Sequence, residues 1–205
     1  MALVVHSLAL EIVVWVAYVR TTMVLLAAVR MLSNRRRMVT AKWGWVEIAC
    51  APEMLVLPAV ASWVSSGHAV PADLSSVRLG AALVGAAVSL AASAVTLWAV
   101  YSFPKLTTGH YVLDDHELVT AGPYRIVRHP IYLGVLGIWL GLSVAFLSPL
   151  AFSVTVLYVL PIYYLYMRSE EDMLGTSLRG YGEYRASTGM LVPRLRRSGP
   201  GERAS

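Results

Sequence analysis

Five apolar blocks constrain the fold of this 205-residue chain more than any other feature. They cover residues 8–29, 46–64, 77–101, 131–147 and 151–167. A helix of about 20 apolar residues crosses a hydrocarbon core of about 30 Å, and inside a membrane only helices and closed barrels satisfy their backbone polar groups. With 57% hydrophobic and 14% charged residues, the chain is too apolar for an ordinary soluble domain. We therefore expect an all-α integral membrane bundle of about five transmembrane helices.

The basic residues predict how this bundle is oriented. Fifteen of the 17 lysines and arginines fall on one side of it, and only Arg20 and Arg78 lie elsewhere. Because cytoplasmic loops carry the excess of basic residues, we expect the N-terminus outside and the C-terminus in the cytoplasm, in a cell (inner) membrane. The first block lacks the basic flank and cleavage site of a signal peptide, so we expect it to be retained. The net charge of +5 then follows from topology, and no basic stripe with interleaved aromatic residues predicts a nucleic-acid partner.

Charged residues inside the apolar blocks are costly and need partners. Glu11 and Arg20 are nine residues apart, so they point to opposite faces of a helix and cannot pair with each other. Glu53 follows Pro52 in a block that also contains Pro58, which predicts a kinked and partly re-entrant segment. Two hypotheses remain open for Glu53, namely that it lines a cavity or that it pairs with Arg20 and joins two helices.

The last two blocks are joined only by Ser148 and Pro149, a connection that allows nothing but an antiparallel hairpin. Such a hairpin returns the chain to the membrane face that it left. We therefore expect Glu170 and Glu171, which follow the hairpin, to lie near Arg128 and His129, which precede it. The block at 77–101 is rich in Gly, Ala and Ser, which predicts a packing centre for its neighbours.

A polar hinge, residues 116–134, separates the third block from the hairpin. Gly122-Pro123 is a turn dipeptide, and Pro130 disfavours helical backbone at His129. Irregular backbone at a membrane surface needs hydrogen-bond partners from protein, water or a ligand. The hinge is also crowded with basic and aromatic side chains that suit an anionic or zwitterionic ligand: Tyr124, Arg125, Arg128, His129 and Tyr132. The alternative is a basic loop that holds lipid phosphates.

The run GPYRxVRHPxYxG at residues 122–134, with Glu170-Glu171 beyond the hairpin, resembles the isoprenylcysteine carboxyl methyltransferase family of integral membrane enzymes. The resemblance covers about residues 98–195, and it implies that S-adenosylmethionine is bound near the hinge by one glutamate of the last helix. Glu170 is favoured for this role over Glu171. The other implied cofactor contacts are His116, Glu117, Leu118, Val119, Tyr124, His129, Pro130, Ile131 and Tyr132.

The chemistry of this cofactor gives roles to the same residue types. A carboxylate, Glu170 or Glu171, would bind its ammonium group, and Arg125, Arg128 or His129 would bind its carboxylate. Tyr124, Tyr132 and Leu133 would contact the base or the ribose. We expect a membrane methyltransferase that acts on a lipophilic acceptor, a small molecule or a lipid-anchored substrate. The candidates for catalysis are Arg128, Arg168 and Glu170; neither a metal site nor an obligatory protein partner is predicted.

One departure from the family concerns the acceptor. The resemblance implies an arginine one helical turn before the glutamate, which orients a substrate carboxylate, but Tyr166 stands there and Arg168 is the nearest basic residue. A carboxylate that becomes a methyl ester is the favoured acceptor, since it is already ionised near neutral pH. The alternatives are methylation of a lipid amine, a nicotinamide-dependent enzyme like the sterol reductases, and a helical membrane module without enzymatic activity.

The C-terminal part is basic and amphipathic, and Tyr181 and Tyr184 share one helix face. We expect an interfacial helix that caps a cytosolic cofactor pocket, with arginines, including Arg185 and Arg194, on anionic headgroups. Residues 1–197 are predicted to form a single domain, with the cofactor-binding part at about 98–195 and a disordered tail at 198–205.

Overall fold

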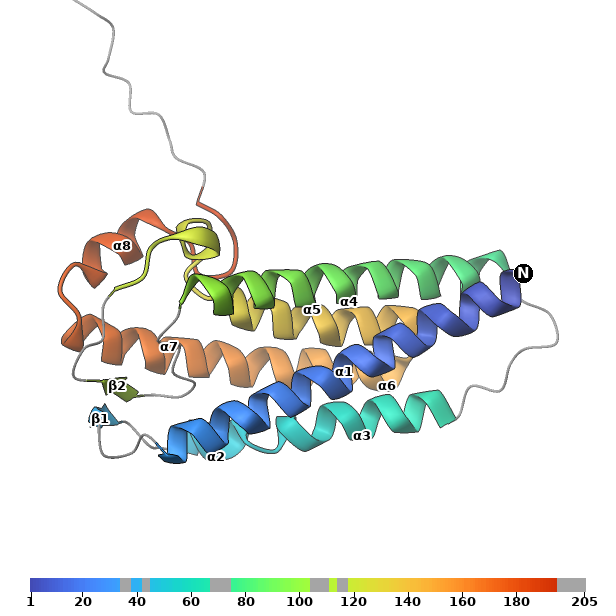
Figure 1. Cartoon of the computed structure of the whole chain (residues 1–205), viewed down its shortest axis with the longest axis horizontal. Coiled ribbons are helices and arrows are strands. Elements are labelled where there is room, and N and C mark those ends of the chain that lie inside the picture. Colours follow the sequence, from blue (N-terminus) through green and yellow to red (C-terminus); the bar gives the residue numbers. More distant parts are fainter. Residues whose placement is uncertain (34–37, 42–44, 67–74, 104–110, 114–117, 195–205) are drawn as a thin grey trace, which may run out of the picture.

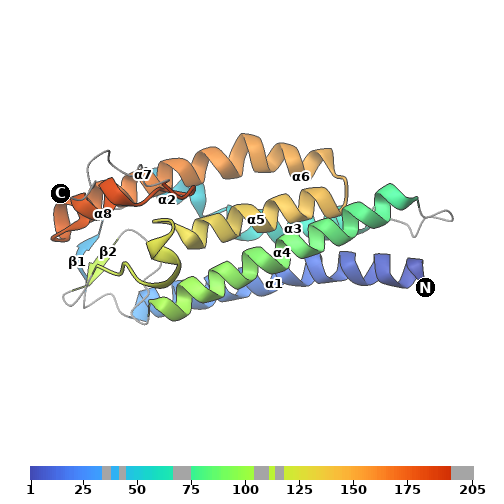
Figure 2. The ribbon, with the colours of Figure 1, turned by 90° about the horizontal axis from the view of Figure 1, so that it is seen from above.

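The computed structural model describes residues 1–33, 38–41, 45–66, 75–103, 111–113 and 118–194. The helices form a long bundle with the N-terminus at one end and α8 at the other (Figures 1 and 2). The helical elements are α1 (Ala2–Ser33), α2 (Trp45–Cys50), α3 (Glu53–Ser66), α4 (Ser76–Ser102), the 3-10 helix η2 (Gly122–Arg125), α5 (Pro130–Ala145), α6 (Pro149–Val154), the π-helical turn η3 (Thr155–Val159), α7 (Leu160–Ser177) and α8 (Tyr181–Ser187). The predicted helical bundle is confirmed.

The outer surface of the bundle suits a membrane. Among the described residues, four helical segments are long and apolar enough to cross one, Ala2–Leu26, Ile48–Ser66, Ser76–Ser102 and Pro149–Ser177, and α5 is a shorter apolar helix. Large apolar side chains point outward along these segments, and Leu157, for example, is 77% exposed. Soluble proteins rarely expose so much contiguous apolar surface to water, so the chain is an integral membrane protein.

Two of the predicted apolar blocks can be compared with the observed helices in detail. The predicted kink in the second block is present, because α2 ends at Cys50 and α3 begins at Glu53, just after Pro52. The last helix continues past the apolar block that ends at Met167 and runs to Ser177, so Glu170 and Glu171 both lie on it, as the resemblance implied for one of them. Its π-helical turn η3 directly precedes Leu160-Pro161, where the missing N–H and the ring of the proline disturb regular α-helical bonding.

A small antiparallel sheet joins two loops, and the sequence analysis did not predict it. The strand β1 (Met38–Ala41) pairs with β2 (Tyr111–Leu113), and Ala41 lies opposite Tyr111. Strands of four and three residues are too short to show an alternating pattern. The sheet connects the segment after α1 with the segment after α4, at the end of the bundle that also holds α8 (Figure 1).

The small residues of α4 allow close contact with α5, as predicted. A Cβ atom added to Gly85 would lie 2.5 Å from Ala145, and one added to Gly141 would lie 2.1 Å from Oγ of Ser89. Neither distance is possible for real atoms. The two helices therefore touch backbone to backbone, and α4 is the packing centre of the bundle.

We expect Gly141→Ala to destabilise the protein by about 1 to 3 kcal/mol, because the new methyl group must push α5 away from α4. The matched control is Gly80→Ala, since a Cβ atom at Gly80 meets nothing within 4 Å and the change favours helix formation. Thermal unfolding in detergent measures both. Equal melting temperatures for the two variants would contradict this account of the α4–α5 contact.

A buried ion pair ties α1 and α3 to the rest of the bundle. Nη1 of Arg20 lies 2.7 Å from Oε2 of Glu53, and neither side chain is exposed. Trp139 of α5 donates its indole N–H to Oε1 of Glu53 at 2.7 Å, and the hydroxyl of Tyr163 in α7 donates to Oε2 at 2.9 Å. Arg20 also donates to the Tyr163 hydroxyl at 2.9 Å. Of the two hypotheses for Glu53, the pairing with Arg20 is confirmed.

Candidate functional site

The hairpin of α5 and the last helix brings the two halves of the predicted site together. Oε1 of Glu171 lies 2.7 Å from Nη2 of Arg128 and 3.1 Å from Nε2 of His129. Oε2 of Glu170 lies 3.6 Å from Nδ1 of His129. His129 therefore stands between the two carboxylates, and the predicted meeting of these four residues is confirmed.

The hinge before α5 has the irregular backbone that its sequence predicts. Gly122 has φ +59°, and a Cβ atom there would lie 2.2 Å from Oγ of Ser102 at the end of α4. Only glycine combines this conformation with such a close approach. His129 has φ −123° and ψ 62°, outside the helical region, as expected of a residue that precedes proline.

The protein itself satisfies the free N–H groups of this hinge. Arg128 N–H donates to the carbonyl of Gly189 at 2.8 Å, and His129 N–H donates to that of Met190 at 3.1 Å. Val127 and Gly189 form a parallel β-bridge. The segment after α8 thus lies along the hinge like a short strand. Nothing in the sequence around Gly189 indicates this pairing, because a bridge of this length has no pattern of its own.

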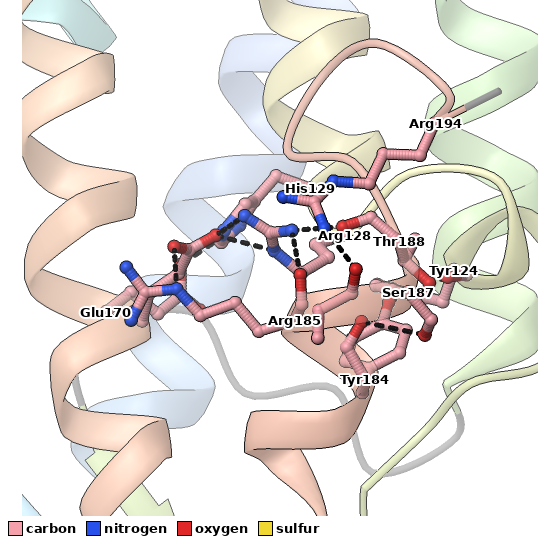
Figure 3. Close-up of polar contacts among 11 residues, drawn as sticks. Tyr124, Arg128, His129, Glu170, Tyr184, Arg185, Ser187, Thr188 and Arg194 are labelled. Atoms are coloured by element: carbon pink, nitrogen blue, oxygen red, sulfur yellow. Dashed lines mark hydrogen bonds and ion pairs between the residues drawn. The ribbon is translucent and has the colours of Figure 1, made fainter. Parts of the chain in front are cut away.

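Arg128 is the residue that fastens this segment to α7 (Figure 3). Its Nε donates to Oε1 of Glu171 at 2.7 Å, while Nη1 donates to the carbonyl of Arg185 at 3.0 Å and to that of Thr188. The side chain of Arg185 adds a contact at 3.2 Å from Nε to Oε2 of Glu171. Glu171 is fully buried, and such a group needs this many cationic partners to remain charged.

Helix α8 lies beside the site and packs its two tyrosines inward from one face. Its two tyrosines, Tyr181 and Tyr184, are buried, with ring centroids 6.0 Å apart. The Tyr184 hydroxyl donates to the carbonyl of Tyr124 in η2 at 2.7 Å. Burial raises the pKa of Tyr184 to about 12, against the opposing charge of Arg128, so the phenol stays protonated and keeps this bond at physiological pH.

Two of the arginines predicted to sit on lipid headgroups contact the protein while they stay at least partly exposed. Arg185, 37% exposed, contacts Glu171, and Nη1 of the exposed Arg194 donates to the carbonyl of Ala186. The predicted disordered tail, 198–205, lies outside the described residues.

Glu170 differs from its neighbour in being available. Its side chain is 22% exposed while that of Glu171 is 0% exposed. The Oε2 atoms of both glutamates are buried and accept no hydrogen bond in the described part of the chain, but that of Glu171 lies 3.2 Å from Nε of Arg185. Buried polar atoms are usually paired, so the Oε2 atom of Glu170 can accept a hydrogen bond from a ligand.

Aromatic rings surround this carboxylate. Tyr132 stands within hydrogen-bonding reach of Glu170, and its ring centroid lies 5.5 Å from His129, 5.5 Å from Tyr163 and 5.7 Å from Tyr166. Through Tyr163, this ring cluster touches the intramembrane pair of Arg20 and Glu53. The site therefore combines a partly exposed carboxylate, one oxygen of which accepts no hydrogen bond in the described part of the chain, with an aromatic wall.

The remaining predicted residues fall into three groups. Leu118 and Val119 lie in the first part of the hinge and are half-buried, and Leu118 lies near Gly180 at the start of α8. Tyr124 packs edge-on against Phe103 at 6.0 Å, and Pro130 and Ile131 begin α5. Arg125 and Arg168 are exposed, and within the described residues neither forms an ion pair or a hydrogen bond with the cluster around Glu170. His116 and Glu117 lie outside the described residues.

Residues 77–179 match the family model described as phospholipid methyltransferase. The chain is also similar to the cobalt-zinc-cadmium resistance protein CzcN of Cupriavidus metallidurans, with 35% identity over 86 residues. That match covers 40% of this chain and 38% of the relative. No solved structure matches the chain.

Proposed function

The chain belongs to the phospholipid methyltransferase family, whose model matches half of it, and on that premise we propose that it transfers a methyl group from S-adenosylmethionine to a lipophilic carboxylate. Family membership makes it a membrane methyltransferase that acts on lipid substrates, as the likeness to the isoprenylcysteine carboxyl methyltransferases predicted. The cofactor and the type of acceptor are our proposal.

The observation that carries the proposal is the buried Oε2 atom of Glu170. S-adenosylmethionine has an ammonium group, and a half-buried carboxylate with one oxygen that accepts no hydrogen bond in the described part of the chain fits that group. Tyr124 and Tyr132 offer aromatic surfaces for the base or the ribose, and Arg125 offers a free guanidinium for the cofactor carboxylate. When bound, the cofactor supplies an electrophilic methyl group on a sulfonium sulfur.

The other residues of the cluster hold this site in place. Arg128 and Glu171 join α7 to the segment after α8, which fixes the backbone of Glu170 relative to the hinge. The tyrosine cluster keeps water away from an acceptor that approaches from the lipid. Since a carboxylate acceptor is already ionised near neutral pH, these residues need not remove a proton. Positioning and a dry environment supply most of the rate.

A second candidate reaction, methylation of a lipid amine, is favoured by one observation. The family arginine that orients a carboxylate is replaced by Tyr166, which packs against Tyr132, and Arg168 is exposed two residues away. Residues two apart on a helix face different directions. An amine would need no such cation, but it would need Glu170 or His129 to accept its proton.

Binding of the cofactor product tests the proposal directly. Purified protein in lipid nanodiscs is titrated calorimetrically with S-adenosylhomocysteine and, separately, with NADPH. We expect S-adenosylhomocysteine to bind and NADPH not to bind. Binding of NADPH alone would point to a reductase, and binding of neither would point to a non-enzymatic membrane module; both results would contradict the proposal.

The acceptor is tested with two matched series, fatty acids and fatty amines of increasing chain length. If the acceptor enters sideways from the lipid, each buried methylene should raise its apparent affinity by about 0.8 kcal/mol, roughly fourfold, until the chain fills the apolar part of the acceptor site. Transfer to acids should be nearly independent of pH from 6 to 8, whereas transfer to amines should rise with pH. Full activity on short, water-soluble acids would contradict lateral entry, and activity on amines alone would select the second reaction.

A further inference from the structure

A cavity of about 920 Å³ lies at the end of the bundle that is farthest from α8. Its walls come from the N-terminal half of α1, the end of α3, the first turn of α4 and the turn between α5 and α6. In Figures 1 and 2 this end holds the N-terminus, while α8 and the end of α7, the helix that carries Glu170, lie at the opposite end. The cavity therefore has no part in the proposed methyl transfer.

The long walls of this cavity are apolar. Leu10 and Val14 line it from α1, Val64 lines it from α3, and Ala145 and Phe146 line it from the end of α5. Two tryptophans, Trp15 and Trp63, also line it and are 66% and 64% exposed. Within a membrane these walls would be in contact with hydrocarbon, so an acyl chain fits between them. A water-soluble ligand would bury little of this apolar surface.

Two side chains of opposite charge also line the cavity, Glu11 from α1 and Arg78 from α4. In the described part of the chain, neither side chain forms an ion pair or a hydrogen bond, and they are not paired with each other. A charge near a membrane is costly unless it meets water or an opposite charge. The cavity thus presents one free cation and one free anion beside an apolar wall.

We propose that this cavity binds one phospholipid whose headgroup carries both a phosphate and an amine. Arg78 binds the phosphate, Glu11 binds the ammonium group, and one acyl chain lies along Leu10, Val14 and Phe146. The charges argue for this class of lipid. An anionic lipid such as phosphatidylglycerol would satisfy Arg78 but would leave Glu11 without a cation, and a plain hydrocarbon chain would satisfy neither.

This lipid is a resident of the protein and is not the methyl acceptor, because its headgroup lies at the membrane face opposite Glu170. It fills the space where α1 and α3 diverge. The inference does not depend on which cofactor or acceptor the enzyme uses.

Native mass spectrometry of the full chain, delipidated in detergent and titrated with phosphatidylethanolamine or phosphatidylglycerol, tests the proposal. We expect wild type to bind phosphatidylethanolamine about tenfold more tightly than phosphatidylglycerol, as a charge-assisted contact implies. Arg78→Gln should weaken phosphatidylethanolamine binding about tenfold, and Glu11→Gln should abolish the preference. Leu10→Trp, which fills the apolar part of the cavity, should weaken both lipids.

The control is the double variant Arg179→Gln/Glu183→Gln, which removes two exposed charges at the other end of the bundle and should leave lipid binding unchanged. Glu11 and Arg78 are themselves exposed, so their replacement should leave the fold intact. Equal binding of the two lipids by wild type would overturn the proposal. The proposal would also be overturned if Arg78→Gln and Glu11→Gln both bound the two lipids as wild type does. An equal loss of phosphatidylethanolamine affinity in the control variant would overturn it too.

Discussion

Glu170→Gln is expected to weaken the binding of S-adenosylhomocysteine by ten- to a hundredfold, which corresponds to about 1.5 to 3 kcal/mol. The reason is that Oε2 of Glu170 is a buried acceptor without a hydrogen-bond partner in the described part of the chain, and glutamine removes the charge that an ammonium group needs. Calorimetric titration of each variant in nanodiscs measures the change.

The two residues that follow Glu170 provide the controls. Asp172→Asn removes an exposed carboxylate on the same helix and should bind like wild type. Glu171→Gln should mainly lower the melting temperature, because it leaves the buried guanidinium of Arg128 without its carboxylate. If Glu171→Gln lost affinity at an unchanged melting temperature while Glu170→Gln bound normally, the roles of the two glutamates would be exchanged.

Glu53→Gln is expected to destabilise the protein by about 3 to 5 kcal/mol, the usual cost of removing one partner from a buried ion pair. Glu53 is fully buried and accepts hydrogen bonds from Trp139 and Tyr163 in addition to its contact with Arg20. The melting temperature in detergent should fall by roughly 6 to 20 °C. Arg20→Met should have a similar effect, since it leaves Glu53 charged and unpaired.

Combining the two changes distinguishes a specific pair from general damage. The double variant Arg20→Met/Glu53→Gln removes both charges, so it should be more stable than the sum of the two single losses predicts. Glu183→Gln, an exposed carboxylate in α8, should change the melting temperature little. Strict additivity of the two single losses would contradict a direct interaction between Arg20 and Glu53.

The sequence by itself determined the features that depend on local pattern. Lengths of apolar sequence located the spanning helices, and the Gly122-Pro123 and His129-Pro130 dipeptides located the irregular hinge, because these residue types restrict their own backbone. The short turn at Ser148-Pro149 determined one long-range fact. Two antiparallel helices of similar length must return to the same membrane face, and Glu170 and Glu171 therefore had to meet His129.

Only the tertiary structure decided which side chains pair within that meeting point. Two adjacent glutamates differ by about 100° around a helix, and the rotation of α7 against its neighbours buries Glu171 against Arg128 and leaves Glu170 partly exposed. The same holds for Glu53 and Arg20, which come from helices whose relative rotation no local pattern specifies. The bridge between Val127 and Gly189 also escaped prediction. It depends on the position of α8, which the packing of two buried tyrosines determines, and such packing is a property of the whole fold.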